Sequence, residues 1–256
     1  MKPPLIVFFF VSAAMLAGCS SRLDTRRSSP INLLSLSNDA TPKVSILGTS
    51  VKGQPIKSIS LGTGPDTILM LASIHGSEKA GTGLLYKFRD YLVQNKPLLR
   101  GRKVIMVPVV NPDGLEAGSR YNGRGIDLNR NFPTNNRINN IKNGLVALSE
   151  PESRILNQLI LQRRPNRIIT FHEALSCIDY DGPARQLAEV MARNCDLPVH
   201  KLGAQPGSLG AYAGEVLGIP TVTVELTKED SSLAPESLWS RYREMLISAV
   251  VFTPLP

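Results

Sequence analysis

Apolar runs alternate with amphipathic stretches along most of the chain. The runs are rich in β-branched residues and continuously apolar, as expected for strands that are buried on both faces. The stretches between them have one apolar and one polar side, which predicts helices. Strands are predicted at 67–74, 104–110, 167–171 and 220–226, and helices at 79–94, 149–164, 183–195, 209–217 and 235–251.

This alternation predicts the α/β fold class, with a mostly parallel mixed sheet flanked by helices on both faces. The helix at 149–164 has a clear start, with Ser149 as N-cap and Pro151 in the first turn. A chain of 256 residues, of which 42% are hydrophobic and 20% charged, suits one globular core. We therefore expect a single catalytic domain over 43–256.

The N-terminal segment has the parts of a bacterial export signal in the usual order. Lys2 precedes an apolar run over 4–15, which is too short for a comfortable membrane span. The run ends in Leu16-Ala-Gly-Cys19, which resembles the lipobox of bacterial lipoproteins. The expected product is a lipoprotein signal peptide over 1–19.

Cys19 would then be lipidated and become the first residue of the mature protein. A polar, Pro-containing stretch over 20–42 reads as a tether between this anchor and the domain. Ser20, in place of an acidic residue, is typical of outer-membrane sorting, so the expected location is the periplasm. A buried N-terminal segment with an incidental cysteine is the alternative.

Charge and cysteine content narrow the choice of partners. The formal charge of +8 suits an anionic polymer or membrane, but the basic residues are dispersed and accompany no nucleic-acid-binding module. Nucleic acid is therefore not an expected partner. Besides Cys19, only Cys177 and Cys195 remain; an oxidising periplasm would allow them to form a disulfide, and two free buried thiols are the equal alternative.

Candidate metal ligands follow two of the predicted strands. His75 and Glu78 come directly after the strand at 67–74, and His172 comes directly after the strand at 167–171. Chemistry in open parallel sheets collects at the carboxyl ends of the strands. Two imidazoles and one carboxylate leave a fourth position for water, which predicts one catalytic Zn²⁺. The third histidine, His200, is assigned to the surface.

Two acidic residues complete this expected centre. Glu225 lies inside the apolar strand at 220–226, where an unpaired carboxylate is costly to bury, so it is the candidate general base. Asp127 is placed to accept the second ring N–H of a metal-binding histidine. Their structural alternatives are a salt-bridged strand residue and a turn residue.

A polar segment over 111–131 supplies candidate substrate contacts. Asn111-Pro-Asp-Gly114 is a turn by composition, and Arg120, Asn129 and Arg130 follow it. An arginine presents a planar fork that suits a carboxylate or a carbonyl oxygen. Two of them beside a metal-activated water suggest one for the developing oxyanion and one for a substrate carboxylate.

These motifs, in this order from about residue 43 to 250, resemble the zinc carboxypeptidases of the M14 type. The resemblance implies that His75, Glu78 and His172 bind zinc and that Arg120 polarises the scissile carbonyl. It also implies that Asn129 and Arg130 hold the terminal carboxylate of the substrate, and that Glu225 acts first as base and then as acid. The motifs that carry it are His75-x-x-Glu78, Asn111-Pro-Asp-Gly114, Arg120, Asp127-Leu-Asn-Arg-Asn131, His172 and Val224-Glu225-Leu226.

The short chain and three further segments are more similar to the murein peptide amidase branch of this family. That branch cuts the γ-D-glutamyl–diaminopimelate bond of cell-wall peptides, which implies a peptidoglycan-derived substrate and an acidic partner, Asp179 or Asp181, for the substrate's ammonium. Digestive relatives carry a mobile tyrosine before the Gly-Ser that matches Gly207-Ser208, and this chain has none there; Tyr212 is the nearest substitute. The three segments are Phe171-His-Glu-Ala174, Cys177–Pro183 and Pro206–Gly210.

Three other functions remain open at this point. The first is a general peptide metallocarboxypeptidase, and the second is an aspartoacylase-like deacylase of N-acyl amino acids, which uses a similar metal and Asn-Arg set. The third is a non-catalytic wall-binding lipoprotein, which would need no catalytic set. We expect the protein to act as a monomer.

Overall fold

A computed structural model describes Met1 and residues 40–254 of the chain. The expected signal peptide over 1–19, the lipidated Cys19 and nearly all of the tether over 20–42 lie outside the described residues. Residues 40–254 belong to one compact unit, whose first strand begins at Lys43. Within residues 40–254, no helix combines the length and the apolar character needed to cross a membrane.

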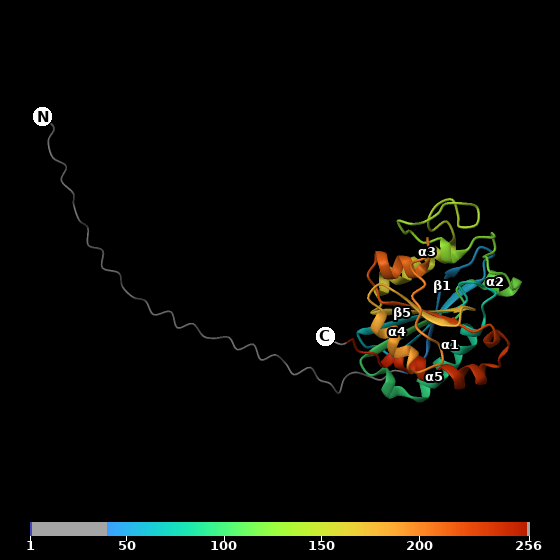
Figure 1. Cartoon of the computed structure of the whole chain (residues 1–256), viewed down its shortest axis with the longest axis vertical. Coiled ribbons are helices and arrows are strands. Elements are labelled where there is room, and N and C mark those ends of the chain that lie inside the picture. The colour runs from blue at the N-terminus through green and yellow to red at the C-terminus, as the bar shows by residue number, and fades with distance from the viewer. Residues whose placement is uncertain (2–39, 255–256) are drawn as a thin grey trace. The chain divides into compact units, whose positions relative to one another are not determined.

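A seven-stranded mixed sheet forms the centre of this unit (Figure 1). Its spatial order is β1-β2-β4-β3-β5-β7-β6. The three central pairs, β4 with β3, β3 with β5 and β5 with β7, are parallel, whereas the three outer pairs are antiparallel. The strands are β1 (Lys43–Thr49), β2 (Pro55–Leu61), β3 (Asp66–Leu71), β4 (Arg102–Val107), β5 (Arg167–Glu173), β6 (Cys177–Asp181) and β7 (Thr221–Leu226).

Helices cover both faces of the sheet, which confirms the predicted fold class. α1, α4 and α5 pack on one face with the apolar side chains of the central strands, and α3 and the π-helical turn η4 pack on the other (Figure 1). The helices are α1 (Ala80–Gln94), α2 (Pro112–Ala117), α3 (Pro151–Arg163), α4 (Arg185–Ala192) and α5 (Pro235–Val251), with short turns η2 (Lys96–Leu99), η3 (Leu128–Arg130), η4 (Ala211–Val216) and η5 (Glu229–Ser232).

The margins of the sheet differ from the prediction. β1, β2 and β6 were not predicted, and all three pair antiparallel. β1 is almost wholly exposed and β2 alternates buried with exposed residues, so neither has the continuous apolar run of a central strand. The sheet is therefore parallel only in its centre.

Several expected boundaries were also wrong. β3 ends at Leu71, three residues earlier than predicted, and β5 continues through His172 to Glu173. The N-cap of α3 is Glu150, because Ser149 turns its hydroxyl to the Glu150 carboxylate instead. The expected turn after Asn111 is helix α2, whose Gly114 N–H donates to the Asn111 side chain.

Cys177 and Cys195 are both free thiols, which decides between the two alternatives left by the sequence. Cys177 is buried in β6, and burial raises the pKa of its thiol to about 11, so it stays protonated. Cys195 is only partly buried, just after α4.

Candidate metal centre and active site

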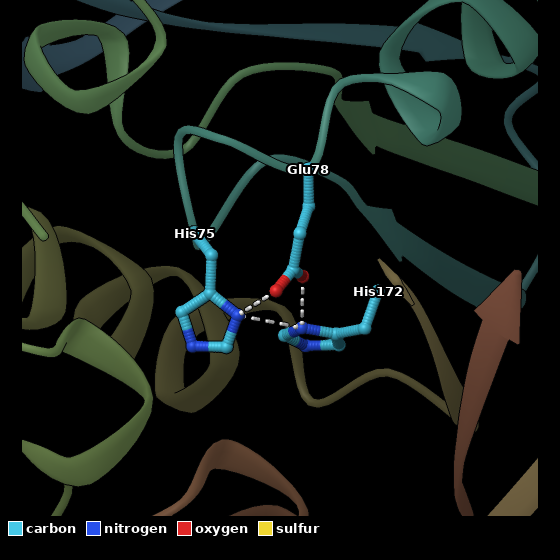
Figure 2. Close-up of side chains that lie close together, drawn as sticks. All are labelled: His75, Glu78 and His172. Carbon is cyan, nitrogen blue, oxygen red and sulfur yellow. Dashed lines mark hydrogen bonds and ion pairs between the residues drawn. The ribbon is translucent and has the colours of Figure 1, made fainter. Parts of the chain in front are cut away.

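His75, Glu78 and His172 come together from two neighbouring strands. His75 and Glu78 lie on the loop between β3 and α1, and His172 lies near the end of β5. Their donor atoms all lie within 4.8 Å of one another. Nδ1 of His75 is 2.7 Å from Oε1 of Glu78 and 3.1 Å from Nδ1 of His172, which is 2.9 Å from Oε2 of Glu78 (Figure 2).

The donor set fits a cation. Nε2 of His75 faces the Asp127 carboxylate at 3.2 Å, so a neutral His75 uses its single N–H there. Nδ1 of His75, Nδ1 of His172 and the Glu78 carboxylate then converge as possible metal ligands. One divalent ion shared by two imidazoles and a carboxylate resolves this convergence, and zinc is the ion that such nitrogen and oxygen sets suit.

The surroundings keep Glu78 ionised. Burial would raise the pKa of this carboxyl, but its hydrogen bonds with His172 and His75 outweigh burial and lower it to about 2. For His75, burial lowers the pKa, but the acceptors Asp127 and Glu78 outweigh burial, so the pKa of His75 is raised. All three side chains are buried, so a bound ion is held away from bulk solvent.

Asp127 and Arg120 form the next layer of contacts around the metal ligands. Nε of Arg120 donates to Oδ2 of Asp127 at 3.0 Å, and its Nη1 lies 3.4 Å from Oε1 of Glu78. Asp127 thus faces the ring N–H of His75 as the sequence suggested. Arg120 stays partly exposed and lines the cavity described next.

A cavity of about 450 Å³ opens beside the metal ligands. Glu225 lines it from β7, where it pairs in register with His172 of β5. Burial raises the pKa of the Glu225 carboxyl, and the charge on Glu78 adds to this, whereas His172 and His75 lower it. A carboxylate with a raised pKa next to the metal side of the cavity is suited to take up a proton.

Asn129 and Arg130 also line the cavity, from the turn η3 that Asp127 caps. Oδ1 of Asn129 accepts the Leu209 N–H at 2.9 Å, which fixes the orientation of its amide. Nη1 of Arg130 donates to the Asn129 carbonyl oxygen at 2.7 Å. Both side chains therefore line the same cavity as the metal ligands.

Asp179 and Asp181 add an acidic part to the lining of the same cavity. Oδ1 of Asp179 accepts the Leu202 N–H at 2.8 Å. Asp181 is only 3% exposed, and its Oδ1 has no hydrogen-bond partner among the described residues. Burial, together with the charge of Asp179, raises the pKa of Asp181 to about 6. Lys201, whose charge partly lowers the pKa of Asp181, donates to the Tyr180 carbonyl oxygen and not to Asp181.

Tyr212, His200 and Glu173 bear on the predicted composition of the site. The hydroxyl of Tyr212 donates to Asn157 and its ring stacks on Phe132, so Tyr212 is buried away from the cavity and does not substitute for the missing tyrosine. His200 is exposed, as expected. Glu173, which was not a predicted site residue, lines the cavity and accepts the N–H of Ala80 at the start of α1.

The chain matches the family model described as zinc carboxypeptidase over residues 31–186. It is 34% identical over 210 residues to murein peptide amidase A of Escherichia coli strain K12, an alignment that covers 75% of this chain and 82% of the relative. It is 32% identical over 215 residues to the protein of the same name from Vibrio campbellii, with 74% and 81% covered.

Among solved structures, the fold is similar to murein-tripeptide amidase MpaA from Escherichia coli O157. The TM-score is 0.68 at 26% sequence identity, and the match covers 84% of this chain and 94% of that one. A carboxypeptidase A from Helicoverpa armigera matches with a TM-score of 0.69 at 21% identity, which shows the shared fold alone.

Proposed function

Because the chain belongs to the zinc carboxypeptidase family, we propose that it hydrolyses an amide bond in cell-wall peptides, namely the γ-D-glutamyl–diaminopimelate bond of murein peptides. The family makes the chain a zinc-dependent hydrolase. One observation carries the finer proposal. The cavity that begins at the metal ligands also includes a buried carboxylate, Asp181, whose Oδ1 has no hydrogen-bond partner among the described residues, and this suits a substrate that carries an ammonium group.

The residues divide the reaction between them. When bound by His75, Glu78 and His172, zinc supplies Lewis acidity and lowers the pKa of a water molecule. Glu225 takes a proton from the attacking water and later donates it to the leaving nitrogen. Arg120 donates to the carbonyl oxygen as negative charge develops on it. Asp127 holds the ring of His75 in one tautomer.

The rest of the cavity binds the leaving diamino acid. Asn129 and Arg130 hold one of its carboxylates, in keeping with the planar fork of arginine. Asp179 and Asp181 receive its side-chain ammonium, which offsets the unfavourable burial of the Asp181 carboxylate. The names of the two bacterial amidases above support a murein peptide as the substrate class.

The decisive experiment compares substrates for the purified, zinc-loaded protein. L-Ala-γ-D-Glu-diaminopimelate should be cleaved at the γ-D-glutamyl bond, with products identified by mass spectrometry. Peptides that end in Phe or Lys and N-acetyl-aspartate are the matched alternatives. Preference for a Lys-terminated peptide would favour the general carboxypeptidase, and preference for N-acetyl-aspartate would favour the deacylase.

A variant of the proposed base separates catalysis from mere binding. Glu225→Gln keeps the size of the side chain but cannot take up a proton, so turnover should fall by roughly 10²–10⁴-fold. The zinc content, measured by atomic absorption, should remain one ion per chain because Glu225 is not a ligand in the trio. Unchanged turnover would exclude Glu225 as the base, and a metal-free, inert wild type would leave the wall-binding alternative.

We also propose that the protein is an outer-membrane-anchored lipoprotein of the periplasm. The order of Lys2, the apolar run and the small residues before Cys19 supports this location. The positive charge of the chain suits the anionic polymers of the cell wall.

A further inference from the structure

Arg120 and Asp127 lie at the two ends of one short loop, although both act at the metal centre. The ion pair between them closes this loop. The backbone between them folds back in a tight turn that begins at Asn122. The N–H of Asn122 donates to the Ile126 carbonyl oxygen at 3.0 Å, and the carbonyl oxygen of Asn122 accepts the Gly125 N–H at 3.0 Å. The separation of Arg120 from Asp127 therefore depends on the bend at 122–126.

The side chain of Asn122 holds this bend from inside. Its Oδ1 accepts two backbone N–H groups, from Arg124 and Ile126, each at 3.0 Å. Asn122 is only 6% exposed, so water does not compete well for these bonds. Only a short side chain with an acceptor oxygen at this position can bond both N–H groups of the bend.

The other side of the same amide fastens the loop to the start of α3. Nδ2 of Asn122 donates to Oε2 of Glu150 at 2.8 Å and to Oε2 of Glu152 at 3.1 Å. Both carboxylates are buried, and Glu152 also accepts the N–H of Val51. An amide is required here because aspartate would offer no donor and would place a third acid beside two others.

We infer that Asn122 is a positioning residue for the proposed reaction: it sets the loop that places Arg120 against the substrate carbonyl and Asp127 against His75. It touches neither metal nor substrate and acts only through the loop. The inference rests on the proposed function for the role of Arg120. The contact of Asp127 with His75 does not depend on the substrate.

The test reverses the direction of one hydrogen bond. Asn122→Asp retains the acceptor for the two backbone N–H groups but loses both donors, so zinc affinity by chelator competition and kcat should each fall about 10–100-fold, as for other residues that orient metal ligands. In the double variant Asn122→Asp with Glu152→Gln, the new amide donates to the new carboxylate. This variant should recover part of both losses, because the contact with Glu150 stays unrepaired, and Glu152→Gln alone is its control.

Tyr242→Phe is the matched stability control. This change removes the hydroxyl that donates to the buried Asp230. Tyr242 lies on α5 in the core cluster, on the face of the sheet opposite α3. It should lower the unfolding temperature without changing zinc affinity. If Asn122→Asp behaves like Tyr242→Phe, or if the double variant recovers nothing, the inference is wrong.

A second variant covers a failure to fold, and the zinc affinity separates this inference from the proposed function. If Asn122→Asp does not fold, Asn122→Ser retains an acceptor but cannot reach both carboxylates, and it should show the same losses in smaller measure. If the wild type does not cleave the murein tripeptide, the proposed function fails, while zinc affinity still tests the position of Asp127. Unchanged zinc affinity in both Asn122 variants would then overturn the inference.

Discussion

Glu78 and Glu225 face the same cavity, and their surroundings shift the two carboxyl pKa values in opposite directions. Hydrogen bonds from two imidazoles lower the pKa of Glu78 to about 2, which suits a permanent metal ligand. Burial raises the pKa of Glu225, whose neighbours offer it less compensation. Different pKa values at two nearby acids are how one site separates a ligand from a proton carrier.

Asp181 provides a prediction about stability and pH. Its pKa rises from 3.8 to about 6 on folding, so the ionised form is disfavoured in the folded state and stability is lost as pH rises from about 4 to 6. Asp181→Asn removes this loss. At pH 7.5 the variant should be more stable by at most about 3 kcal/mol, with the gain vanishing near pH 4. Urea unfolding at the two pH values measures both.

The same variant should weaken binding of a substrate with an ammonium group. KM for the murein tripeptide should rise at least tenfold, with little change for a peptide that ends in Phe. Equal effects on both substrates would show that Asp181 does not receive the ammonium. Greater stability joined to poorer binding would mean that the free protein keeps an unfavourable carboxylate for its ligand.

At the scale of elements, the loop that carries His75 and Glu78 is seated closely against α2. A Cβ added to Gly76 would lie 2.0 Å from the Gly114 carbonyl carbon and 2.2 Å from the Leu115 nitrogen. Both are backbone atoms, so the contact cannot be relieved by turning a side chain. The helix that follows Asn111 thus supports the metal loop from behind.

Gly76→Ala should therefore disturb the metal centre. Overpacking of this kind costs about 1–3 kcal/mol, and two of the three ligands are on the displaced loop, so both unfolding temperature and zinc affinity should fall. Gly83→Ala, within α1, is the matched control. Its added Cβ would meet only Pro235 of α5, at 3.6 Å. That change should stabilise the helix by about 0.5–1 kcal/mol. Equal zinc affinity in both variants would contradict the support by α2.

The sequence predicted those elements whose apolar pattern is set by burial, along a whole strand or along one face of a helix. α5 was predicted with its observed bounds because Pro235 starts it and its apolar residues have a helical period. β1 was missed because its residues face mostly solvent, so its position depends on pairing with β2 rather than on an apolar run. The position of His172 inside β5 was missed because a strand end depends on pairing, here with Glu225 and Leu226 of β7.

On the scale of the whole unit, the strand order explains why distant residues meet. β3, β5 and β7 are neighbours and parallel, so their carboxyl ends lie at one edge and bring together His75, His172 and Glu225. This convergence followed from the parallel pattern alone. The acidic part of the cavity could not be expected from the parallel pattern. Asp181 lies on β6, a strand that was not predicted and that runs antiparallel to β7.

The proposed anchor at Cys19 precedes the first strand of the domain, so removing the anchor should leave catalysis intact. Cys19→Ser removes the thiol that would carry the lipid, so radiolabelled palmitate should enter the wild type and not the variant when both are produced in a Gram-negative host. The wild type should also be found in the outer-membrane fraction as a shortened chain. Ala40 is buried and β1 begins at Lys43, well after Cys19, so the purified variant should retain the wild-type kcat on the murein tripeptide. Palmitate in both proteins, or in neither, would refute lipidation at Cys19 without touching the proposal for the active site.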